Sequence, residues 1–209
     1  MSEPKGYTNI ITIENYLLTT IKEYFKSQVE EWIVQTEDFI EDITGRVFIA
    51  DEVATYRKFE LDRNYSEEIW FDECVEVEEL KYDGEVVDEE NYYIYPANSI
   101  PKNRIKLEGS VYTVRSSPNL SLGGNYFYKG NQNIGVKAKW GYSVEVPGDI
   151  KTAATAIVAG IITFAGKKDI PGGVEKETIG PYSLVFSNPK GWADTTNVDR
   201  ILNKYTKVT

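Results

Sequence analysis

Residues 136–165 read VKAKWGYSVEVPGDIKTAATAIVAGIITFA. Apolar and polar side chains alternate over residues 135–142, which predicts a β-strand. Pro147 and Asp149 then supply helix-start signals, namely a fixed φ angle and a carboxylate that can accept first-turn N–H groups. Residues 150–164 are apolar or small on nearly every face, so they predict a buried central helix. We expect this helix to be too short, and too closely flanked by charge, to span a bilayer.

Two helices are predicted before this stretch. Residues 1–11 lack a periodic pattern and are expected to form a loose N-terminal tail. Thr8 or Thr12 then caps a short helix, and a second helix runs from about Glu23 to Thr44, with Gly45 as its C-terminal cap. Its apolar stripe consists of Val29, Trp32, Ile33, Thr36, Phe39, Ile40 and Ile43. Its outer face is acidic and consists of Glu30, Glu31, Glu37, Asp38, Glu41 and Asp42.

A β-rich region follows the second helix. Its expected strands are residues 53–61, 68–71, 75–82, 85–87, 92–95, 104–107, 111–114 and 134–140. Asp83 and Gly84 predict a two-residue hairpin turn between two of them. Short strands at this spacing, set between helices, predict a small antiparallel sheet or barrel.

The predicted fold class is therefore α+β. We expect a small bundle of about four helices around a central buried helix, with a large antiparallel β insertion between the second and third helices. The predicted domains are residues 1–48 and 141–209 for the helical core and residues 49–140 for the insertion. The last helix has an apolar face made of Val198, Ile201, Leu202 and Tyr205.

The composition excludes several kinds of chemistry. The chain of 209 residues has no histidine, so imidazole bases, Ser-His-Asp triads and most transition-metal sites are excluded. Its single cysteine, Cys74, excludes an internal disulfide and a cysteine-based zinc site, and its acidic neighbours are expected to raise the thiol pKa. Phosphate-binding and EF-hand motifs are absent, so we expect no cofactor and no metal. The four tryptophans could form an aromatic platform that stacks on a sugar or a nucleic-acid base, but we expect most of them to pack in the core. They are Trp32, Trp70, Trp140 and Trp192.

Charge is spread unevenly along the chain. The net charge is −10, and residues 60–90 alone carry 14 acidic and 2 basic side chains. Residues 91–209 carry 15 basic and 8 acidic side chains. The acidic block would repel nucleic-acid phosphates, and its simplest interpretation is a solvated surface on strands that resist edge pairing. No secretory signal is seen at the N-terminus, which suits a reducing compartment.

Three segments, taken in order, resemble the head–tail connector (adaptor, or head-completion) proteins of long-tailed bacteriophages and prophages. They are residues 37–48 (EDFIEDITGRVF), residues 136–142 with 146–153 (VKAKWGY and VPGDIKTA), and residues 177–184 with 201–205 (ETIGPYSL and ILNKY). The middle of the chain departs from the smaller members of that family, which join their helices by a short hairpin or two. The resemblance therefore says little about what the acidic insertion contacts.

The resemblance implies a structural virion protein and not an enzyme. Such a subunit forms a ring of about a dozen copies beneath the portal protein, extends the DNA channel, and presents a surface to a stopper or tail-completion protein. DNA passes through without specific binding, and no membrane is involved. The implied location is the head–tail interface of the virion, and the host cytoplasm during assembly. The candidate portal and ring contacts are Ile179, Gly180, Pro181, Tyr182, Val198, Ile201, Leu202 and Tyr205.

Three alternatives remain open from the residues. The apolar face of the last helix could simply close the core over the central helix and make no contact with a partner. This face consists of Val198, Ile201, Leu202 and Tyr205. The chain could be a different phage tail, baseplate or host-surface binding module that acts through its β insertion. A carbohydrate hydrolase that uses paired carboxylates is the third, but 33 acidic residues make such pairs common by chance.

Overall fold

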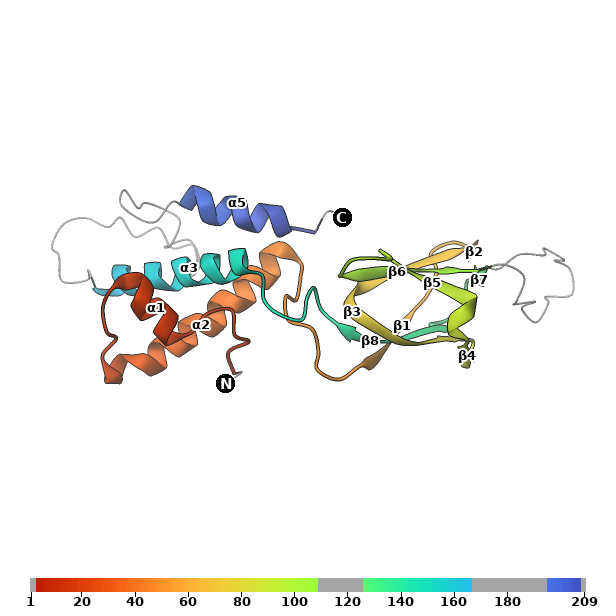
Figure 1. Ribbon diagram of the computed structural model, residues 1–209, viewed down its shortest axis with the longest axis horizontal. Helices are drawn as coiled ribbons and strands as arrows, with labels where there is room; N and C mark the ends of the chain where they lie inside the picture. Colours follow the sequence, from red (N-terminus) through yellow and green to blue (C-terminus); the bar gives the residue numbers. More distant parts are fainter. Residues whose placement is uncertain (1–2, 109–125, 167–194, 208–209) are drawn as a thin grey trace, which may run out of the picture. The chain divides into compact units, whose positions relative to one another are not determined.

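The computed structural model describes residues 3–108, 126–166 and 195–207 (Figure 1). The chain divides into two compact units. The helical unit comprises Met1–Arg46 and Val146–Thr209, and the β unit comprises Val47–Glu145. Helices in one unit and an antiparallel sheet in the other confirm the predicted α+β class.

Four α-helices make up the described part of the helical unit. They are α1 (Ile10–Leu17), α2 (Glu23–Thr44), α3 (Gly148–Gly166) and α5 (Thr195–Tyr205). The helices α1, α2 and α5 all contact α3, which is therefore central, as predicted. Side chains of α3 that are fully or almost fully buried include Ile150, Ala153, Ala154, Ile157, Val158 and Ala159.

The helix ends follow local capping chemistry. The helix α2 and its left-handed cap Gly45, with φ 65°, lie where the sequence predicts them. Asn9 caps α1, because its side chain accepts a hydrogen bond from the Thr12 N–H at 2.9 Å. The expectation of a threonine cap is therefore wrong. The helix α3 begins at Gly148, so Asp149 lies in its first turn and not before it.

The length of α3 corrects one expectation. Residues Gly148–Ala165 are long and apolar enough to cross a membrane by length and composition, so the helix is not too short. Of this window, 44% is buried inside the chain, against three other helices. The core helix of a globular unit passes the same test, and the absence of a membrane partner stays a prediction.

The β unit contains one six-stranded sheet and one two-stranded sheet. The strands are β1 (Thr55–Phe59), β2 (Tyr65–Ser66), β3 (Glu68–Tyr82), β4 (Glu85–Val87), β5 (Tyr92–Tyr95), β6 (Lys102–Leu107), β7 (Phe127–Tyr128) and β8 (Ile134–Trp140). The larger sheet has the order β1-β8-β3-β6-β5, with β4 paired to β3, and the smaller one pairs β2 with β7. A short 3-10 helix, Glu89–Asn91, precedes β5. The paired strands are all antiparallel.

The strand β3 is longer than predicted. The sequence predicts two strands, residues 68–71 and 75–82, whereas the structure has a single strand of 15 residues. Its first half pairs with β6 and its second half with β8. The register shifts near Cys74 and again between Val77 and Glu79. These irregularities interrupt the alternation of buried and exposed side chains, which is why the pattern indicates a break.

Other predictions for the β unit are confirmed. Asp83 and Gly84 have φ angles of 51° and 87°, as a two-residue hairpin with left-handed central residues requires. The bounds of β5 and β8 match the predicted residues 92–95 and 134–140. The predicted strand at residues 111–114 lies outside the described residues.

Trp140, at the end of β8, anchors the core of the β unit. Its ring is 2% exposed and lies against Phe59 and Phe71, with centroids 5.9 and 6.1 Å away. Its indole N–H donates to the Thr55 carbonyl at 2.9 Å, so the polar atom of this buried ring is satisfied. The Arg57 guanidinium lies 4.6 Å from the centroid of the same ring.

Gly141 follows this tryptophan, and its conformation needs glycine. Its φ angle is 143°, and a Cβ built on it would lie 2.5 Å from the Cα of Ala50. Its N–H donates to the Glu73 carbonyl at 2.8 Å. The backbone immediately after β8 therefore passes directly against the segment that precedes β1, and no side chain fits between them.

We predict that Gly141→Ala destabilises the protein by about 2 kcal/mol or more, because the methyl group meets backbone and the φ angle is unfavourable. Gly148→Ala is the matched control, since a Cβ at Gly148 meets nothing within 4 Å. It is expected to change the free energy of unfolding by less than about 0.5 kcal/mol. Urea denaturation followed by circular dichroism measures both variants. Equal stabilities would contradict this role of Gly141.

Candidate interaction site

The predicted contact residues of the last helix lie on the inner side of α5. Val198 and Ile201 are each 7% exposed and Leu202 is 3% exposed, while Tyr205 is half-buried. The helix α5 contacts α3 and α2, so the three aliphatic side chains fill the core of the helical unit. Closing the core was the alternative interpretation of these residues. A role in docking stays a prediction for them.

Polar contacts fix the C-terminal end of α5 to the rest of the helical unit. Lys204 Nζ lies 2.7 Å from a carboxylate oxygen of Asp149 in the first turn of α3. This hydrogen-bonded pair raises the pKa of Lys204 and lowers the pKa of Asp149. Arg46 Nε donates to the Tyr205 carbonyl, and the Lys207 N–H donates to the Thr44 carbonyl at 2.9 Å. The C-terminal end of α5 is thereby bound to the C-terminal end of α2.

The other candidate contact residues lie outside the described residues. They are Ile179, Gly180, Pro181 and Tyr182. Their role in a contact therefore stays a prediction. Trp192, one of the four tryptophans considered as a platform, also lies outside the described residues.

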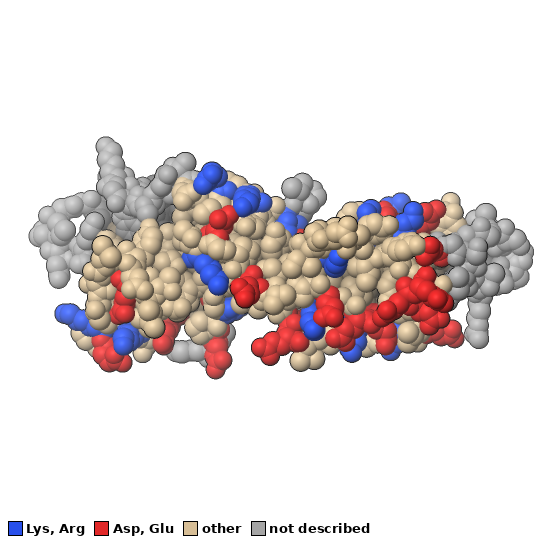
Figure 2. All heavy atoms as spheres, in the orientation of Figure 1, with Lys and Arg blue, Asp and Glu red and all other residues tan. Residues whose placement is uncertain are grey.

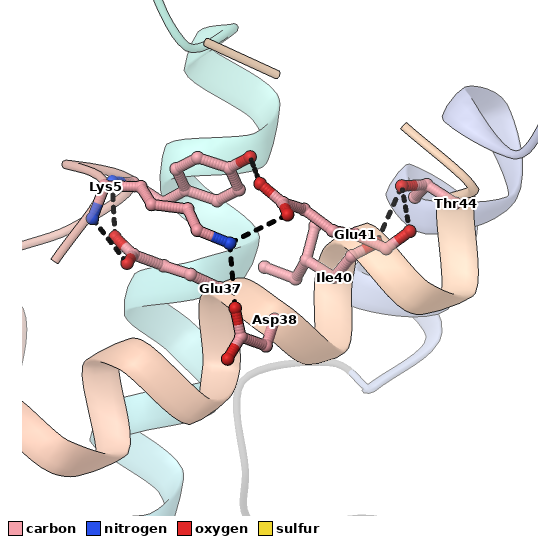
Figure 3. Close-up of polar contacts among 7 residues, drawn as sticks. Lys5, Glu37, Asp38, Ile40, Glu41 and Thr44 are labelled. Carbon is pink, nitrogen blue, oxygen red and sulfur yellow. Dashed lines mark hydrogen bonds and ion pairs between the residues drawn. The ribbon is translucent and has the colours of Figure 1, made fainter. Parts of the chain in front are cut away.

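The N-terminal segment is not a loose tail, contrary to the expectation. Glu37 on α2 accepts hydrogen bonds from the Lys5 N–H at 2.7 Å and the Tyr7 N–H at 2.9 Å (Figure 3). Lys5 Nζ lies 2.8 Å from carboxylate oxygens of both Asp38 and Glu41. Three acids of α2 thus hold the segment before α1 against the helix.

Burial shows how tightly this segment is held. Tyr7 and Glu37 have no exposed surface, and the Tyr7 hydroxyl donates to Glu41 at 2.5 Å. The Thr8 hydroxyl pairs with the Thr155 hydroxyl of α3 at 2.7 Å. The prediction that Glu37 lies on the outer face of α2 is therefore wrong. No local pattern signals the contact, because it joins residues about thirty positions apart.

Burial also alters the chemistry of Glu37. Loss of solvent raises the pKa of this carboxyl above its usual 4.5, although the N–H groups of Lys5, Gly6 and Tyr7 favour the charged form and oppose the shift. The carboxylate is the acceptor for the buried Tyr7 N–H and for the partly buried Lys5 N–H, and it thereby holds the N-terminal segment against α2.

On the β unit, the acidic block of the sequence forms ion pairs across strands. Glu76 and Glu78 of β3 pair with Lys139 and Lys137 of β8 at 2.6 and 2.8 Å. Figure 2 shows acidic side chains gathered on one side of this unit, with basic ones among them. Acids from the acid-rich part of the sequence and lysines from the base-rich part therefore lie on neighbouring strands, where their charges partly cancel. Each exposed pair contributes little stability.

Two kinds of site considered from the sequence, a metal site and a reactive cysteine, can be checked in the described residues. No cluster of three or more Cys, Asp or Glu side chains suits a metal ion there. Cys74 is buried, and this burial raises its pKa to about 12, so its thiol stays protonated. The direction agrees with the prediction, but the cause is loss of solvent and not acidic neighbours, since Lys102 and Arg57 lower the pKa.

The tryptophans separate into packed and exposed ones. Trp140 is buried, and Trp32 is half-buried with its ring 5.3 Å from that of Phe25. Trp70 is 59% exposed on β3, which the alternation pattern does not reveal. An alternating strand has two faces, and the sequence alone does not say which of them is covered.

Comparisons with known proteins identify the fold. No protein-family model matches the chain, and no curated protein matches it either. Solved structures do match over the whole of this chain. A chain from the neck of an empty gene transfer agent (GTA) particle, computed with C6 symmetry, is 11% identical with a TM-score of 0.55, over 94% of its own length.

Two further structures agree. A chain of the native GTA virion is 14% identical with a TM-score of 0.53, over 94% of its length. A chain from the neck of the native particle, computed with C12 symmetry, is 11% identical with a TM-score of 0.50, over 93% of its length. At these identities the likeness shows a shared fold, and it includes both the helical unit and the β unit.

We predict that Glu37→Ala destabilises the helical unit by about 3 kcal/mol, because it leaves the buried Tyr7 N–H and the partly buried Lys5 N–H without an acceptor. Glu30→Ala, on an exposed position of the same helix, is the matched control and is expected to cost less than about 0.5 kcal/mol. Urea denaturation followed by circular dichroism compares them. Similar losses in both variants would show that the contact does not hold the N-terminal segment.

A second prediction concerns pH. The pKa of Glu37 is raised in the folded state, so the folded protein binds this proton more tightly than the unfolded chain does. The contribution of Glu37 to stability is therefore complete below pH 4.5 and declines as the pH rises through the folded-state pKa. The free energy of unfolding of the native protein minus that of Glu37→Gln should fall over this window. A difference that rises with pH would contradict the direction of the shift.

Proposed function

We propose that this protein is a structural subunit of the neck of a phage or phage-like particle, where it acts as a head–tail connector. One observation carries the proposal: the whole chain, including its large β unit, shares its fold with chains from the neck and virion of a GTA particle. The three ordered sequence segments that resemble connector proteins support it independently. The function is assembly and not catalysis.

The subunit forms a ring under the portal protein. The related neck structures were computed with C6 and C12 symmetry, which suits a ring of about a dozen copies. In such a ring each copy contacts the next through two different surfaces. The ring extends the DNA channel from the portal toward a stopper or tail-completion protein.

The charge of the chain suits a passage through which DNA moves. The net charge is −10, and acidic side chains are prominent on the β unit. Lysines and arginines on its strands are largely engaged with these acids, as in the pairs Glu76–Lys139 and Glu68–Arg104. Phosphates are therefore repelled more than captured, and DNA passes without specific binding.

The proposed location is the head–tail interface of the virion, with the host cytoplasm as the place of assembly. The portal is the first partner, and the C-terminal part of the chain is the proposed contact. Because Val198, Ile201 and Leu202 are engaged in the core, contact with the portal would use the exposed side of α5 or the region of residues 179–182. Neither a cofactor nor a membrane is part of the proposal.

Co-sedimentation with the portal ring encoded by the same genome tests this function. We expect the full chain to sediment with the portal, and negative-stain images to show portals extended by one additional ring. A portal from an unrelated genome is the control for nonspecific binding. If a correctly folded cognate portal sediments without the chain, the connector function is wrong.

A further inference from the structure

One face of the larger sheet carries aromatic and charged side chains on three neighbouring strands, β3, β6 and β5. The alternate positions of these strands, such as Ile69, Ile105 and Tyr92, are buried in the core of the β unit. The side chains between them therefore lie on the opposite face, where they form two cross-strand rows that we call the Trp70 face. The rows are Trp70–Arg104–Tyr95 and Glu68–Lys106–Tyr93.

Aromatic rings of this face are open to solvent and spaced along it. Trp70 is 59% exposed and Tyr93 is 48% exposed. The guanidinium carbon of Arg104 lies 5.0 Å from the ring centroid of Trp70 and 4.8 Å from that of Tyr95. The strands β3 and β5 are two strand spacings apart, so the backbones of Trp70 and Tyr95 are about 10 Å apart. Rings spaced in this way can contact a ligand that extends over more than one six-membered ring.

The cations of the Trp70 face are paired with acids. Arg104 donates a hydrogen bond to the Glu68 carboxylate at 3.1 Å. Lys106 Nζ lies 3.2 Å from a carboxylate oxygen of Glu67. Each pair places a hydrogen-bond donor beside an acceptor, and it leaves no large excess of either charge on the face.

Charged ligands fit this face poorly. Residues 88–90, which precede β5, are three exposed acids, and the Tyr93 hydroxyl donates to a further acid, Glu108. A phosphate chain or a nucleic acid would meet these carboxylates, together with cations that are already engaged. A cationic ligand would meet Arg104 and Lys106 on the face itself. The balance of charge therefore favours an uncharged ligand.

Sugar rings have the chemistry that matches both the rings and the pairs of this face. A sugar presents C–H groups on the faces of its ring, and these are attracted to the negative π face of an aromatic side chain. Its hydroxyl groups each donate and accept, so they bind well where a donor and an acceptor lie side by side, as Arg104 and Glu68 do.

We propose that the Trp70 face binds an uncharged oligosaccharide of a bacterial cell surface. Trp70 stacks on a sugar ring, and Arg104 and Glu68 bond to the sugar hydroxyls. The sheet and the contacts of Arg104 hold these groups in place before the ligand arrives, which lowers the cost of ordering them.

This binding is additional to the connector role. The site uses side chains of the β unit alone, so its chemistry does not require a ring. Only the choice of a cell surface as the source of the sugar rests on the proposed function, because a phage-like particle meets its host at that surface.

A glycan array probed with the labelled full chain tests the proposal. The array carries neutral and anionic oligosaccharides from bacterial capsules and lipopolysaccharides. We expect binding to one or more neutral oligosaccharides and none to polyanionic ones. Binding confined to anionic oligosaccharides, or binding to none of the neutral ones, would overturn the proposal.

Substitutions then locate the site on the neutral oligosaccharide that binds. Trp70→Ala is expected to weaken binding about tenfold or more, whereas Trp70→Phe, which keeps a ring for stacking, weakens it only about threefold. Tyr24→Ala removes a ring that is 80% exposed on α2, and this matched control is expected to leave binding unchanged. Circular dichroism checks that each variant is folded. Unchanged binding by folded Trp70→Ala would contradict the assigned site.

Co-sedimentation of the same variants with the cognate portal separates this inference from the connector function. The native chain and Trp70→Ala are expected to sediment with the portal equally. Loss of portal binding in Trp70→Ala, in a chain that binds no glycan, would show that the face contacts protein and would overturn the proposal. Failure of the native chain to bind the portal would overturn the connector function and leave a positive glycan result standing.

Discussion

The helical unit depends on the burial of one helix by all the others. The helix α3 presents small residues, Ala153, Ala154 and Ala159, which let its neighbours approach closely. The hydroxyl of Thr155, the polar group on this buried surface, is satisfied by the Lys151 carbonyl and by the Thr8 hydroxyl. The N-terminal segment, α1, α2 and α5 can therefore all pack against one apolar helix. Without α3, each of the three other described helices would lose the neighbour with which it makes its most extensive contact.

Charged groups set geometry in this protein more than they supply stability. In the helical unit, Glu37 is buried and serves two backbone N–H groups at the start of the chain. In the β unit, acids of β3 meet lysines of β8, so two parts of the sequence with opposite charge become neighbouring strands. These ion pairs fix which strands are neighbours, and each contributes little stability by itself.

Local signals made much of the fold predictable from the sequence. The bounds of α2 follow from its apolar stripe and Gly45, and the hairpin follows from Asp83 and Gly84. Features that depend on contacts between distant residues were not predictable. Glu37 looks like any exposed acid of an amphipathic helix, and bulges make β3 look like two strands. The candidate site was predicted only in part. Three of its aliphatic side chains on α5 are buried in the core of the helical unit. The exposure of Trp70 was not predictable, because the sequence does not say which face of the sheet is covered.

Imaging of the neck in particles produced by the genome that encodes this chain tests the central claim most directly. Single-particle reconstruction at a resolution that traces side chains would identify the protein in each ring between head and tail. We predict a ring of about a dozen copies of this chain immediately below the portal, with both of its units traced in every copy. A neck built entirely from other proteins, with this chain elsewhere in the particle or absent from it, would contradict the account.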